Sequence, residues 1–345
     1  MSGVKEIARR ANVSIATVDR VIHNRSGVSE STKKRINEII KEINFQPNIL
    51  ASRLASKKVN HLAILIPQSE ETEFWQAPLS GIERAVDEIK QYGVVLEKYF
   101  FDLNDKQSFK AEAKRILDSK IDGVLIAPSF VDESISFIIE CQKRRIPYVF
   151  INSDIPGQDN LCYIGPHLWH SGYQAAQLIS FGLPEQKILI VNISKEIDNY
   201  HHLLRKEEGF RAYFKDNDRK NQIIKIDIRK TDEHSVDEHL EKVFKDHPDI
   251  KAVFVTNSRV SAVAHYFHVK SIENVFLVGY DFLPENIENL KRGTIQFLIC
   301  QKPEEQGYKA IMALFNHLVL SSAVEKEHFM PIDIITKENY AFYKN

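Results

Sequence analysis

Apolar residues recur at three- and four-residue spacing near the N-terminus, a pattern typical of helices. It predicts two short helices, over Lys5–Ala11 and Ile15–Ile22, separated by a tight turn. Ser14 is placed to cap the second helix, because its side-chain oxygen can accept a hydrogen bond from a free backbone N–H. Two short helices around a tight turn suit a helix-turn-helix, whose second helix lies in the DNA major groove. A generic helical hairpin fits this stretch equally well.

The pattern continues with a third helix, which Ser29 is placed to cap and which runs to about Ile43 with isoleucines along one stripe. This stripe gives the two short helices an apolar surface to pack on. Pro47 cannot continue a helix, and Asn48 can cap a further short helix that reaches Leu54. Seven or eight residues are too few for a stable isolated helix. We therefore expect this hinge segment to be loose in the free protein and to order when two copies meet on DNA.

From residue 61 onward the pattern changes to short, nearly continuous apolar runs that alternate with amphipathic helical stretches. Such runs are typical of buried parallel strands covered by helices on both faces. Two consecutive sets of this rhythm predict an α/β body of two doubly wound lobes with a cleft between them. The predicted parts are an all-α head over 1–47, a hinge over 48–60 and a body over 61–345, with lobe 1 over about 61–164 and 300–322 and lobe 2 over about 165–297 and 323–345.

Charge is unevenly distributed between these parts. Residues 1–60 hold 12 Lys and Arg and 5 Asp and Glu, whereas the remaining residues hold 34 and 42. A basic head on an acidic body is typical of a protein that presents one end to a polyanion. The sequence lacks a membrane-spanning stretch and a signal peptide. Cys141, Cys162 and Cys300 have no metal-ligand spacing and are expected to be buried thiols, which favours a cytoplasmic protein.

The segments VSIATVDRVIHNRSGVSESTKKRI and INFQPNILASRLASKK resemble the DNA-binding head of the lactose-repressor/galactose-repressor family, over essentially all of residues 4–58. An arginine can hold guanine O6 and N7 with two donors, hydroxyls can contact phosphates, and an apolar wedge in the minor groove can kink the duplex. The resemblance implies base contacts by Ile15, Ala16 and Arg20, phosphate contacts by Ser14, Thr17, Ser29 and Thr32, and hinge roles for Asn48 and for Leu54 as the wedge.

Three positions of this head leave alternatives open. Leu54 could instead form a small core pair with Leu50. Asp19 stands where many members of the family carry Ser. A carboxylate beside DNA is repelled unless it accepts a hydrogen bond from a cytosine amino group or pairs with Arg20. Arg53 comes one position later than the family's usual basic residue, so the sequence does not decide whether Arg53 contacts a phosphate near the hinge.

The body resembles the ribose-type periplasmic sugar-binding fold that the same family carries, over about residues 61–343. The clearest segments are EFWQAPLSGIERA, VFINSD, RKEEGFRAYF, VTNSRV and VGYDFLPENIENLKRGTIQFLICQKPEEQGYKA. Each follows a strand end, where ligands bind in doubly wound sheets. The resemblance implies that Phe74 and Trp75 stack on the apolar face of a sugar, although Trp75 could also be a core aromatic. It implies polar ligand contacts by Asn152, Ser153, His167, Lys206, Asn257, Asp281 and Gln301.

Several of these polar positions differ from the family pattern. Lys206 stands where Arg is usual and loses the bidentate fork, which neighbouring Arg205 could replace. His167 stands where many members carry Asp. Asn152 and Ser153 replace the acidic and basic residues that the family usually carries in that loop. These changes suggest a ligand other than a plain aldopentose, such as an acid sugar or a sugar phosphate. Asp281 could accept a hydrogen bond from the ligand or cap a helix over 284–291, and we favour the ligand.

The function expected from this resemblance is a sugar-responsive transcriptional regulator, a homodimer that binds a palindromic operator. A repressor released by an inducer is the commoner arrangement in the family, and a corepressor or an activator is equally compatible with the sequence. A solute-binding protein for transport is disfavoured by the basic head and the missing signal peptide. An enzyme is disfavoured because the sequence has no GxGxxG, P-loop, nucleophile elbow or metal-ligand cluster. No cofactor or metal is expected, since His201, His202, His265 and His268 show no metal-ligand spacing.

Overall fold

The chain divides into two compact units, a head over Met1–Lys58 and a body over Val59–Asn345. The structure, a computed structural model, describes residues 3–22, 25–45, 50, 53–54, 58–69, 73–182, 185–195, 197 and 201–345.

The head consists of α1 (Gly3–Ala11), α2 (Ile15–Ile22) and α3 (Glu30–Glu42). Each helix contributes to one small core, which contains Ile7, Ala8, Ala11, Val18, Ile36 and Ile39. These apolar residues are the ones that the helical spacing places on a common face, so the three predicted helices are confirmed.

Both predicted N-caps of the head are confirmed. The backbone N–H of Thr17 donates to Ser14 Oγ at 3.1 Å, and that of Thr32 donates to Ser29 Oγ at 3.3 Å. Asn48 and most of the predicted hinge helix lie outside the described residues. Leu54 is helical and 52% exposed. That exposure contradicts the alternative in which Leu54 is half of a buried core pair.

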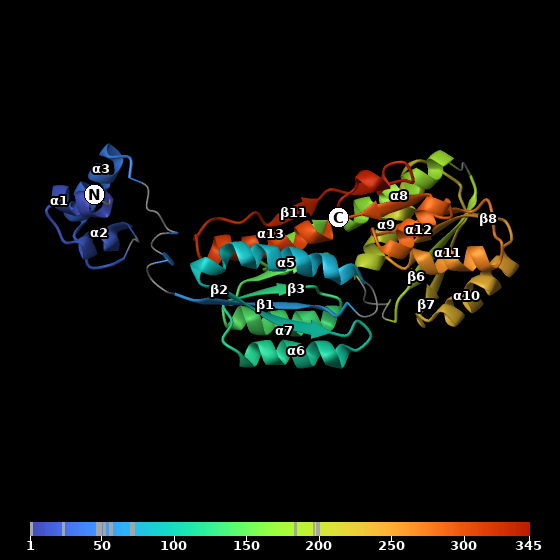
Figure 1. Cartoon of the computed structure of the whole chain (residues 1–345), viewed down its shortest axis with the longest axis horizontal. Coiled ribbons are helices and arrows are strands. Elements are labelled where there is room, and N and C mark those ends of the chain that lie inside the picture. The colour runs from blue at the N-terminus through green and yellow to red at the C-terminus, as the bar shows by residue number, and fades with distance from the viewer. Residues whose placement is uncertain are drawn as a thin grey trace. The chain divides into compact units, whose positions relative to one another are not determined.

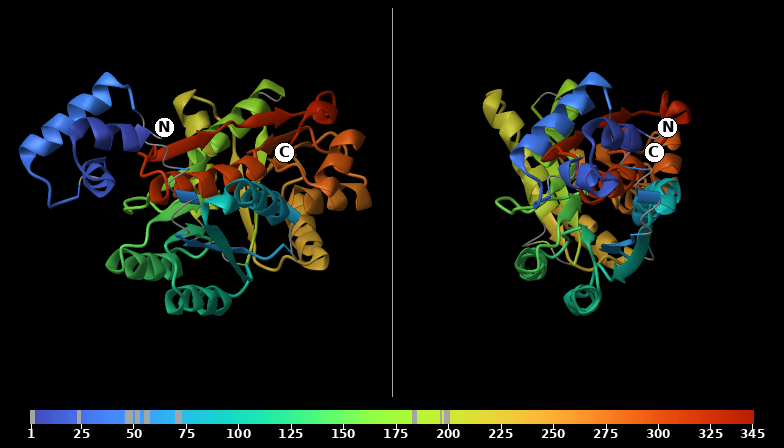
Figure 2. Two further views of the ribbon diagram at one scale, coloured as in Figure 1. Left: turned by 60° about the vertical axis from the view of Figure 1, so that its left-hand side comes forward. Right: turned by 90° about the vertical axis from the view of Figure 1, so that its left-hand side faces the viewer.

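Lobe 1 of the body is built on a parallel sheet in the order β11-β5-β4-β3-β1-β2. Helices α5 and α13 lie on one face of this sheet, and α6 and α7 lie on the other (Figure 1, Figure 2). The elements are β1 (Asn60–Pro67), α5 (Gln76–Ile89), β2 (Val94–Phe101), α6 (Lys106–Asp118), β3 (Gly123–Ile126), α7 (Val131–Lys143), β4 (Tyr148–Ile151), β5 (Cys162–Pro166), α13 (Pro303–Leu318) and β11 (Glu327–Met330).

Lobe 2 repeats the arrangement with a sheet in the order β12-β10-β9-β8-β6-β7, which is parallel except for the β10–β12 pair. Helices α8 and α9 pack on one face, and α10, α11 and α12 on the other. The elements are α8 (Leu168–Gly182), β6 (Lys187–Ile193), α9 (His201–Asp216), β7 (Ile223–Ile228), α10 (Glu233–Asp246), β8 (Ile250–Val255), α11 (Val260–Val269), β9 (Phe276–Tyr280), α12 (Pro284–Arg292), β10 (Phe297–Cys300) and β12 (Asp333–Ile335). Short 3-10 turns cover Glu73–Trp75, Lys90–Tyr92 and Tyr340–Phe342. The two predicted doubly wound parallel sheets are confirmed.

The C-terminal tail corrects the predicted lobe boundaries. Strand β11 pairs with β5 in the sheet of lobe 1, whereas the sequence prediction placed all of 323–345 in lobe 2. The four residues of β11 carry no continuous apolar run, and the chain reaches them directly from α13, which packs on lobe 1. The chain therefore crosses between the lobes after β5, after β10 and after β11.

Helices α8 and α9 pack with their backbones in close approach. A Cβ atom on Gly172 would lie 1.8 Å from the carbonyl oxygen of Lys206, and one on Gly209 would lie 1.8 Å from that of Trp169. Only glycine fits at both positions, and this packing fixes the backbone from which Lys206 extends.

Cys141, Cys162 and Cys300 are free and buried, as predicted. Among the described helices, none combines the length and the apolarity needed to cross a membrane.

Candidate functional site

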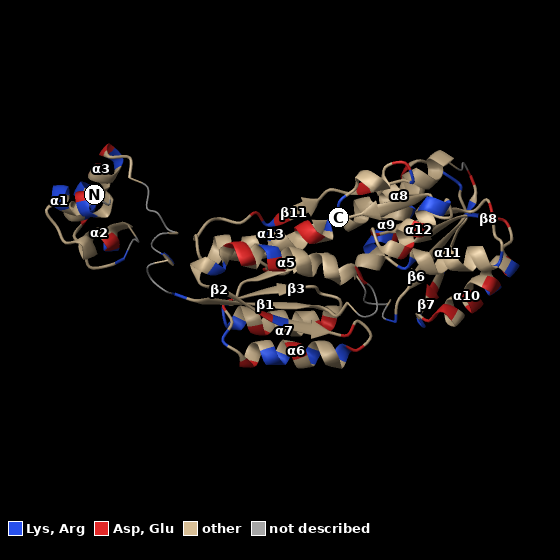
Figure 3. Cartoon of the chain, in the orientation of Figure 1, with Lys and Arg blue, Asp and Glu red and all other residues tan. Residues whose placement is uncertain are grey.

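Helix α2 of the head has one buried face and one exposed face. Val18 is fully buried in the core, whereas Ile15, Ala16 and Arg20 are exposed. Ile15 is 49% exposed, so its side chain is accessible on this helix. Lys and Arg residues lie on the neighbouring helices α1 and α3 (Figure 3). The three residues predicted to read bases therefore share one accessible surface.

The hydroxyls predicted to contact phosphates form two pairs at helix N-termini. Ser14 Oγ lies 2.9 Å from Thr17 Oγ1, and Ser29 Oγ lies 2.8 Å from Thr32 Oγ1. Free backbone N–H groups at a helix N-terminus attract anions, and the hydroxyls add further donors. Both pairs could therefore hold a phosphate oxygen.

Asp19 has a cationic partner that sequence reasoning did not identify. Arg25 Nη1 lies 3.2 Å from Asp19 Oδ2, and both side chains are largely exposed. The pair compensates part of the negative charge that Asp19 adds to the exposed face of α2.

A polar cavity lies in the body where the strands of both sheets end. The space open to the centres of water molecules is about 70 Å³, several times the roughly 10–15 Å³ that a single water needs. Residues from both lobes line it. The lining residues that sequence reasoning predicted are Phe74, Trp75, Asn152, Lys206, Asn257, Asp281 and Gln301.

The two predicted aromatic residues meet edge to face at the wall formed by lobe 1. The ring centroids of Phe74 and Trp75 are 5.2 Å apart, with an angle of 88° between the ring planes. Trp75 is only 4% exposed, yet it lines the cavity. Its ring therefore both packs in the lobe and offers an apolar surface to the cavity.

Asp281 is the carboxylate of the cavity and is 6% exposed. Its Oδ1 accepts a hydrogen bond from Gln301 Nε2 at 2.8 Å. Burial raises the pKa of Asp281 to about 6, although Lys206 and the Gln301 hydrogen bond act in the opposite direction. The N-cap of α12 is Leu283, so Asp281 does not cap that helix. The structure thus contradicts the alternative cap role.

Lys206 brings a buried cation to the same cavity. Its Nζ donates to the carbonyl of Thr256 at 3.2 Å and lies 3.6 Å from the ring centroid of Tyr280. Burial lowers the pKa of Lys206 to about 8, and the charge of Asp281 partly offsets this effect. Arg205, suggested above as a substitute, forms an ion pair with Glu208 and does not line the cavity.

Asn257 is held in place by two backbone contacts. Its Nδ2 donates to the carbonyl of Ile193 at 2.8 Å, and its Oδ1 accepts from the N–H of Arg259 at 3.2 Å. These contacts join the ends of β6 and β8, so the amide is part of a fixed wall.

Two predicted ligand residues lie outside this cavity. His167 lines a separate cavity with Arg205, and its Nδ1 lies 2.9 Å from His170 Nδ1. Burial and then the neighbouring His170 lower the pKa of His167. The chain leaves β5 toward lobe 2 at this point, which takes His167 away from the other strand ends. Ser153 is 5% exposed and does not line the cavity, although Asn152 beside it does.

Sequence reasoning missed part of the lining. The missed residues lie at or just after strand ends, or on α9, and the rule for doubly wound sheets could have located most of them. They are Leu103, Asn104, Ile193, Ser194, Lys195, His202, Thr231, Ser258 and Arg259. Burial holds the pKa of His202 well below its ordinary value, so this imidazole is neutral at physiological pH.

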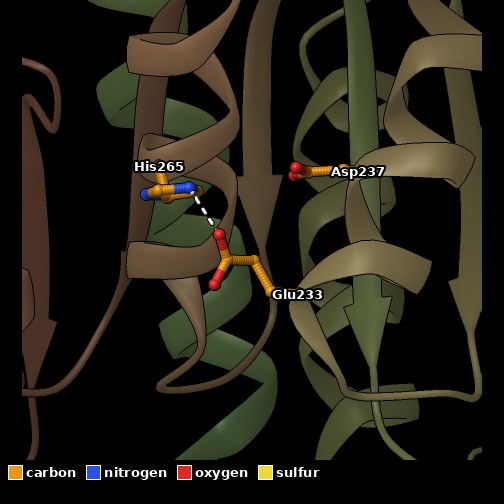
Figure 4. Close-up of side chains that lie close together, drawn as sticks. All are labelled: Glu233, Asp237 and His265. Carbon is orange, nitrogen blue, oxygen red and sulfur yellow. Dashed lines mark ion pairs between the residues drawn. The ribbon is translucent and has the colours of Figure 1, made fainter.

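One cluster of potential metal ligands occurs among the described residues, on α10 and α11. The ligand atoms of Glu233, Asp237 and His265 lie within 4.8 Å of one another (Figure 4). Sequence spacing could not show this cluster, because His265 comes from a different helix. Glu233 Oε1 and His265 Nε2 are 2.6 Å apart, so these two ligand atoms already contact each other.

Comparisons with protein families assign both units. Residues 62–320 match the periplasmic binding protein domain, and residues 3–48 match the bacterial regulatory proteins of the lacI family. Catabolite control protein A from Staphylococcus epidermidis is 28% identical over 157 residues, which cover 46% of this chain and 45% of that protein. The chain thus spans about half the length of the curated relatives that it matches.

Solved structures share the fold of the body. A chain from Bacteroides fragilis assigned to the LacI transcriptional regulators superposes with a TM-score of 0.77 at 29% identity, over 83% of this chain and 100% of that chain. GanP, a glucose-galactose binding protein from Geobacillus stearothermophilus, gives a TM-score of 0.73 at 23% identity, over 82% and 99%. The chain therefore belongs to the periplasmic binding protein domain family and carries, at residues 3–48, the domain of the lacI family of bacterial regulatory proteins.

Proposed function

We propose that this chain is a transcriptional regulator that binds operator DNA through its head and a small carbohydrate-like ligand in the cavity of its body. A homodimer would place two heads on a palindromic operator, because a twofold protein matches a twofold site. We further propose that it is a repressor and that the ligand releases it from DNA.

The observation that carries this proposal is the combination of two surfaces in one chain. Ile15, Ala16 and Arg20 are exposed on a capped helix of a basic head. The body of the same chain holds a cavity that combines an aromatic wall with a carboxylate, a cation and amides. The first surface suits base edges, and the second suits a ring with one apolar face and several hydroxyls.

The proposed ligand control follows from the position of the cavity between the lobes. A ligand that contacts Trp75 in lobe 1 and Asp281 in lobe 2 binds best when these walls are close. Ligand binding can shift the equilibrium between lobe arrangements only as far as it favours one of them. A change in lobe arrangement is therefore the proposed signal to the head.

The DNA-binding proposal is tested by fluorescence anisotropy with a duplex that carries the upstream sequence of the chain's own gene. Replacing Arg20 with Ala should weaken binding by roughly 5- to 150-fold, because a bidentate base contact is worth about 1–3 kcal/mol. Arg219→Ala, an exposed arginine of the body, is the matched control and should bind like the wild type. Equal affinity for the Arg20 variant and the wild type would contradict the proposal.

The ligand proposal is tested by titrating monosaccharides and their acid and phosphate derivatives while recording tryptophan fluorescence. The chain has two tryptophans, Trp75 and Trp169, and only Trp75 lines the cavity. Trp169→Phe should keep the ligand-dependent change, and Trp75→Phe should lose it. A change that survives in Trp75→Phe and disappears in Trp169→Phe would place the ligand outside this cavity.

A further inference from the structure

A series of three hydrogen bonds crosses from one lobe of the body to the other. Asp281 Oδ1 accepts from Gln301 Nε2 at 2.8 Å, and the backbone carbonyl of Gln301 accepts from Gln306 Nε2 at 2.8 Å. Gln306 Oε1 in turn accepts from the backbone N–H of Asn152 at 3.0 Å. The series begins at the cavity wall of lobe 2 and ends at the cavity wall of lobe 1.

Gln306 is the member of this series that does not line the cavity. It lies on α13 and is 1% exposed, while Gln301 is 2% exposed and Asp281 is 6% exposed. Loss of the hydrogen bonds of the Gln306 side chain would be costly, because a buried polar group that loses its partner keeps the full desolvation cost.

The amide of Gln306 is matched to its two partners in only one orientation. Its oxygen faces a backbone N–H, and its nitrogen faces a backbone carbonyl. Rotating the amide by half a turn would bring two donors together at Asn152 and two acceptors together at Gln301. The side chain thus holds two backbone segments at a defined spacing.

These two segments belong to different lobes. Asn152 follows β4 of lobe 1 and has a positive φ of 65°. Gln301 follows β10 of lobe 2, at the point where the chain crosses to α13. Lys302, at this crossing, also has a positive φ, of 53°. Hinges between domains are formed by a few residues at the ends of elements, where changes in backbone angle alter the relative orientation of the domains.

We propose that Gln306 is a positioning residue that sets the alignment of the two cavity walls without itself lining the cavity. It fixes the backbone of Gln301, whose side chain orients the Asp281 carboxylate, and it fixes the loop that carries Asn152. Loss of its hydrogen bonds should let the lobes sample a wider range of angles. This inference concerns the free protein, so it stands or falls independently of the proposed function.

The test measures the distance between spin labels on the two lobes by pulsed electron resonance in the full chain. Exposed positions for the labels are Lys114→Cys on α6 and Glu238→Cys on α10. The native thiols are buried, and burial raises the pKa of Cys141 and Cys162 to about 12, so they react slowly with the label. Gln306→Met removes both hydrogen bonds at similar side-chain volume.

Gln296→Met is the matched control. The amide of Gln296 also accepts from a backbone N–H, that of Leu277 at 2.6 Å, and donates to a backbone carbonyl, that of Gly293 at 2.7 Å. Both of its partners lie within lobe 2. A merely structural role for Gln306 would lower the thermal midpoint of both variants and leave both distance distributions unchanged.

We expect the distance distribution of Gln306→Met to be about twofold broader than that of the wild type, and that of Gln296→Met to overlay the wild type. Gln306→Glu supplies a second variant. Its buried carboxyl can donate to Gln301 only when protonated, so its distribution should be narrow near pH 5 and broad near pH 8. Distance distributions of the wild type at the same two pH values show how much of any broadening comes from the titration of Asp281. Unchanged widths for both Gln306 variants, or equal broadening in the control, would overturn the proposal.

Discussion

The close approach of α8 and α9 makes a quantitative prediction for Gly172→Ala. The added methyl group would lie 1.8 Å from the carbonyl oxygen of Lys206 and 2.6 Å from its carbon. The obstacle is backbone, so it cannot rotate away, and the helices must separate by roughly 1 Å or more. Overpacking of this kind costs about 3 kcal/mol at the upper end of its usual range. The higher helix propensity of Ala offsets about 1 kcal/mol of this cost.

The net loss in the free energy of unfolding should therefore be about 2 kcal/mol, which corresponds to a fall in the thermal midpoint of roughly 3 °C for a unit of this size. Urea unfolding followed by circular dichroism measures the first quantity, and a thermal scan measures the second. Gly157→Ala is the control, because a Cβ there meets nothing within 4 Å and only its φ of 78° opposes the change. Its cost should be about 1 kcal/mol, from the left-handed backbone alone.

A double substitution tests the cause of the destabilisation. Gly209→Ala meets the same kind of obstacle, the carbonyl oxygen of Trp169 at 1.8 Å. Once one methyl group has separated the helices, the second needs little further movement, so the combined loss should be smaller than the sum of the single losses. Additive losses, or a Gly172→Ala protein as stable as the wild type, would refute the reasoning.

The raised pKa of Asp281, about 6 against an ordinary 3.8, means that the folded state binds this proton more tightly than the unfolded state. The wild type should therefore gain stability relative to Asp281→Asn as the pH falls from 7 to 4, by at most about 3 kcal/mol; parallel pH profiles in urea unfolding would contradict this. Ser29→Ala should cost the head about 1 kcal/mol, seen as faster hydrogen exchange in α3, because the helix loses its cap; unchanged exchange would argue against the cap. Asp19→Ser should strengthen DNA binding by about two- to fivefold in low salt, because a repelling surface charge is removed; weaker binding would indicate that the Asp19 carboxylate accepts a hydrogen bond from a base.

The fold could be predicted because its signals are local. Isoleucines at helical spacing located the head helices, and runs such as the one in β6 located the buried strands, since a strand covered on both faces needs no polar position. Strand β11 was assigned to the wrong lobe because its partner, β5, is about 160 residues earlier in the chain. No periodicity within four residues can identify such a partner.

In the pocket, too, the residues fixed by local sequence could be predicted, whereas those fixed by the path of the chain could not. Asp281 and Asn257 follow apolar strands directly, so the strand-end rule located them. His167 also follows a strand, β5, but the chain turns there toward the other lobe, and the residue lies in a different cavity. The pairing of Asp19 with Arg25 depends on the path of the turn between α2 and α3, which residue spacing does not describe.

The C-terminal tail has a consequence for any shortened form of this protein. Within nine residues it supplies β11 to one sheet and β12 to the other, and each strand covers an edge that would otherwise expose unpaired backbone groups. An uncovered edge is a template for pairing with a second chain. A truncation just after α13 would therefore open two sheets at once, and its product should form aggregates rather than a smaller folded protein.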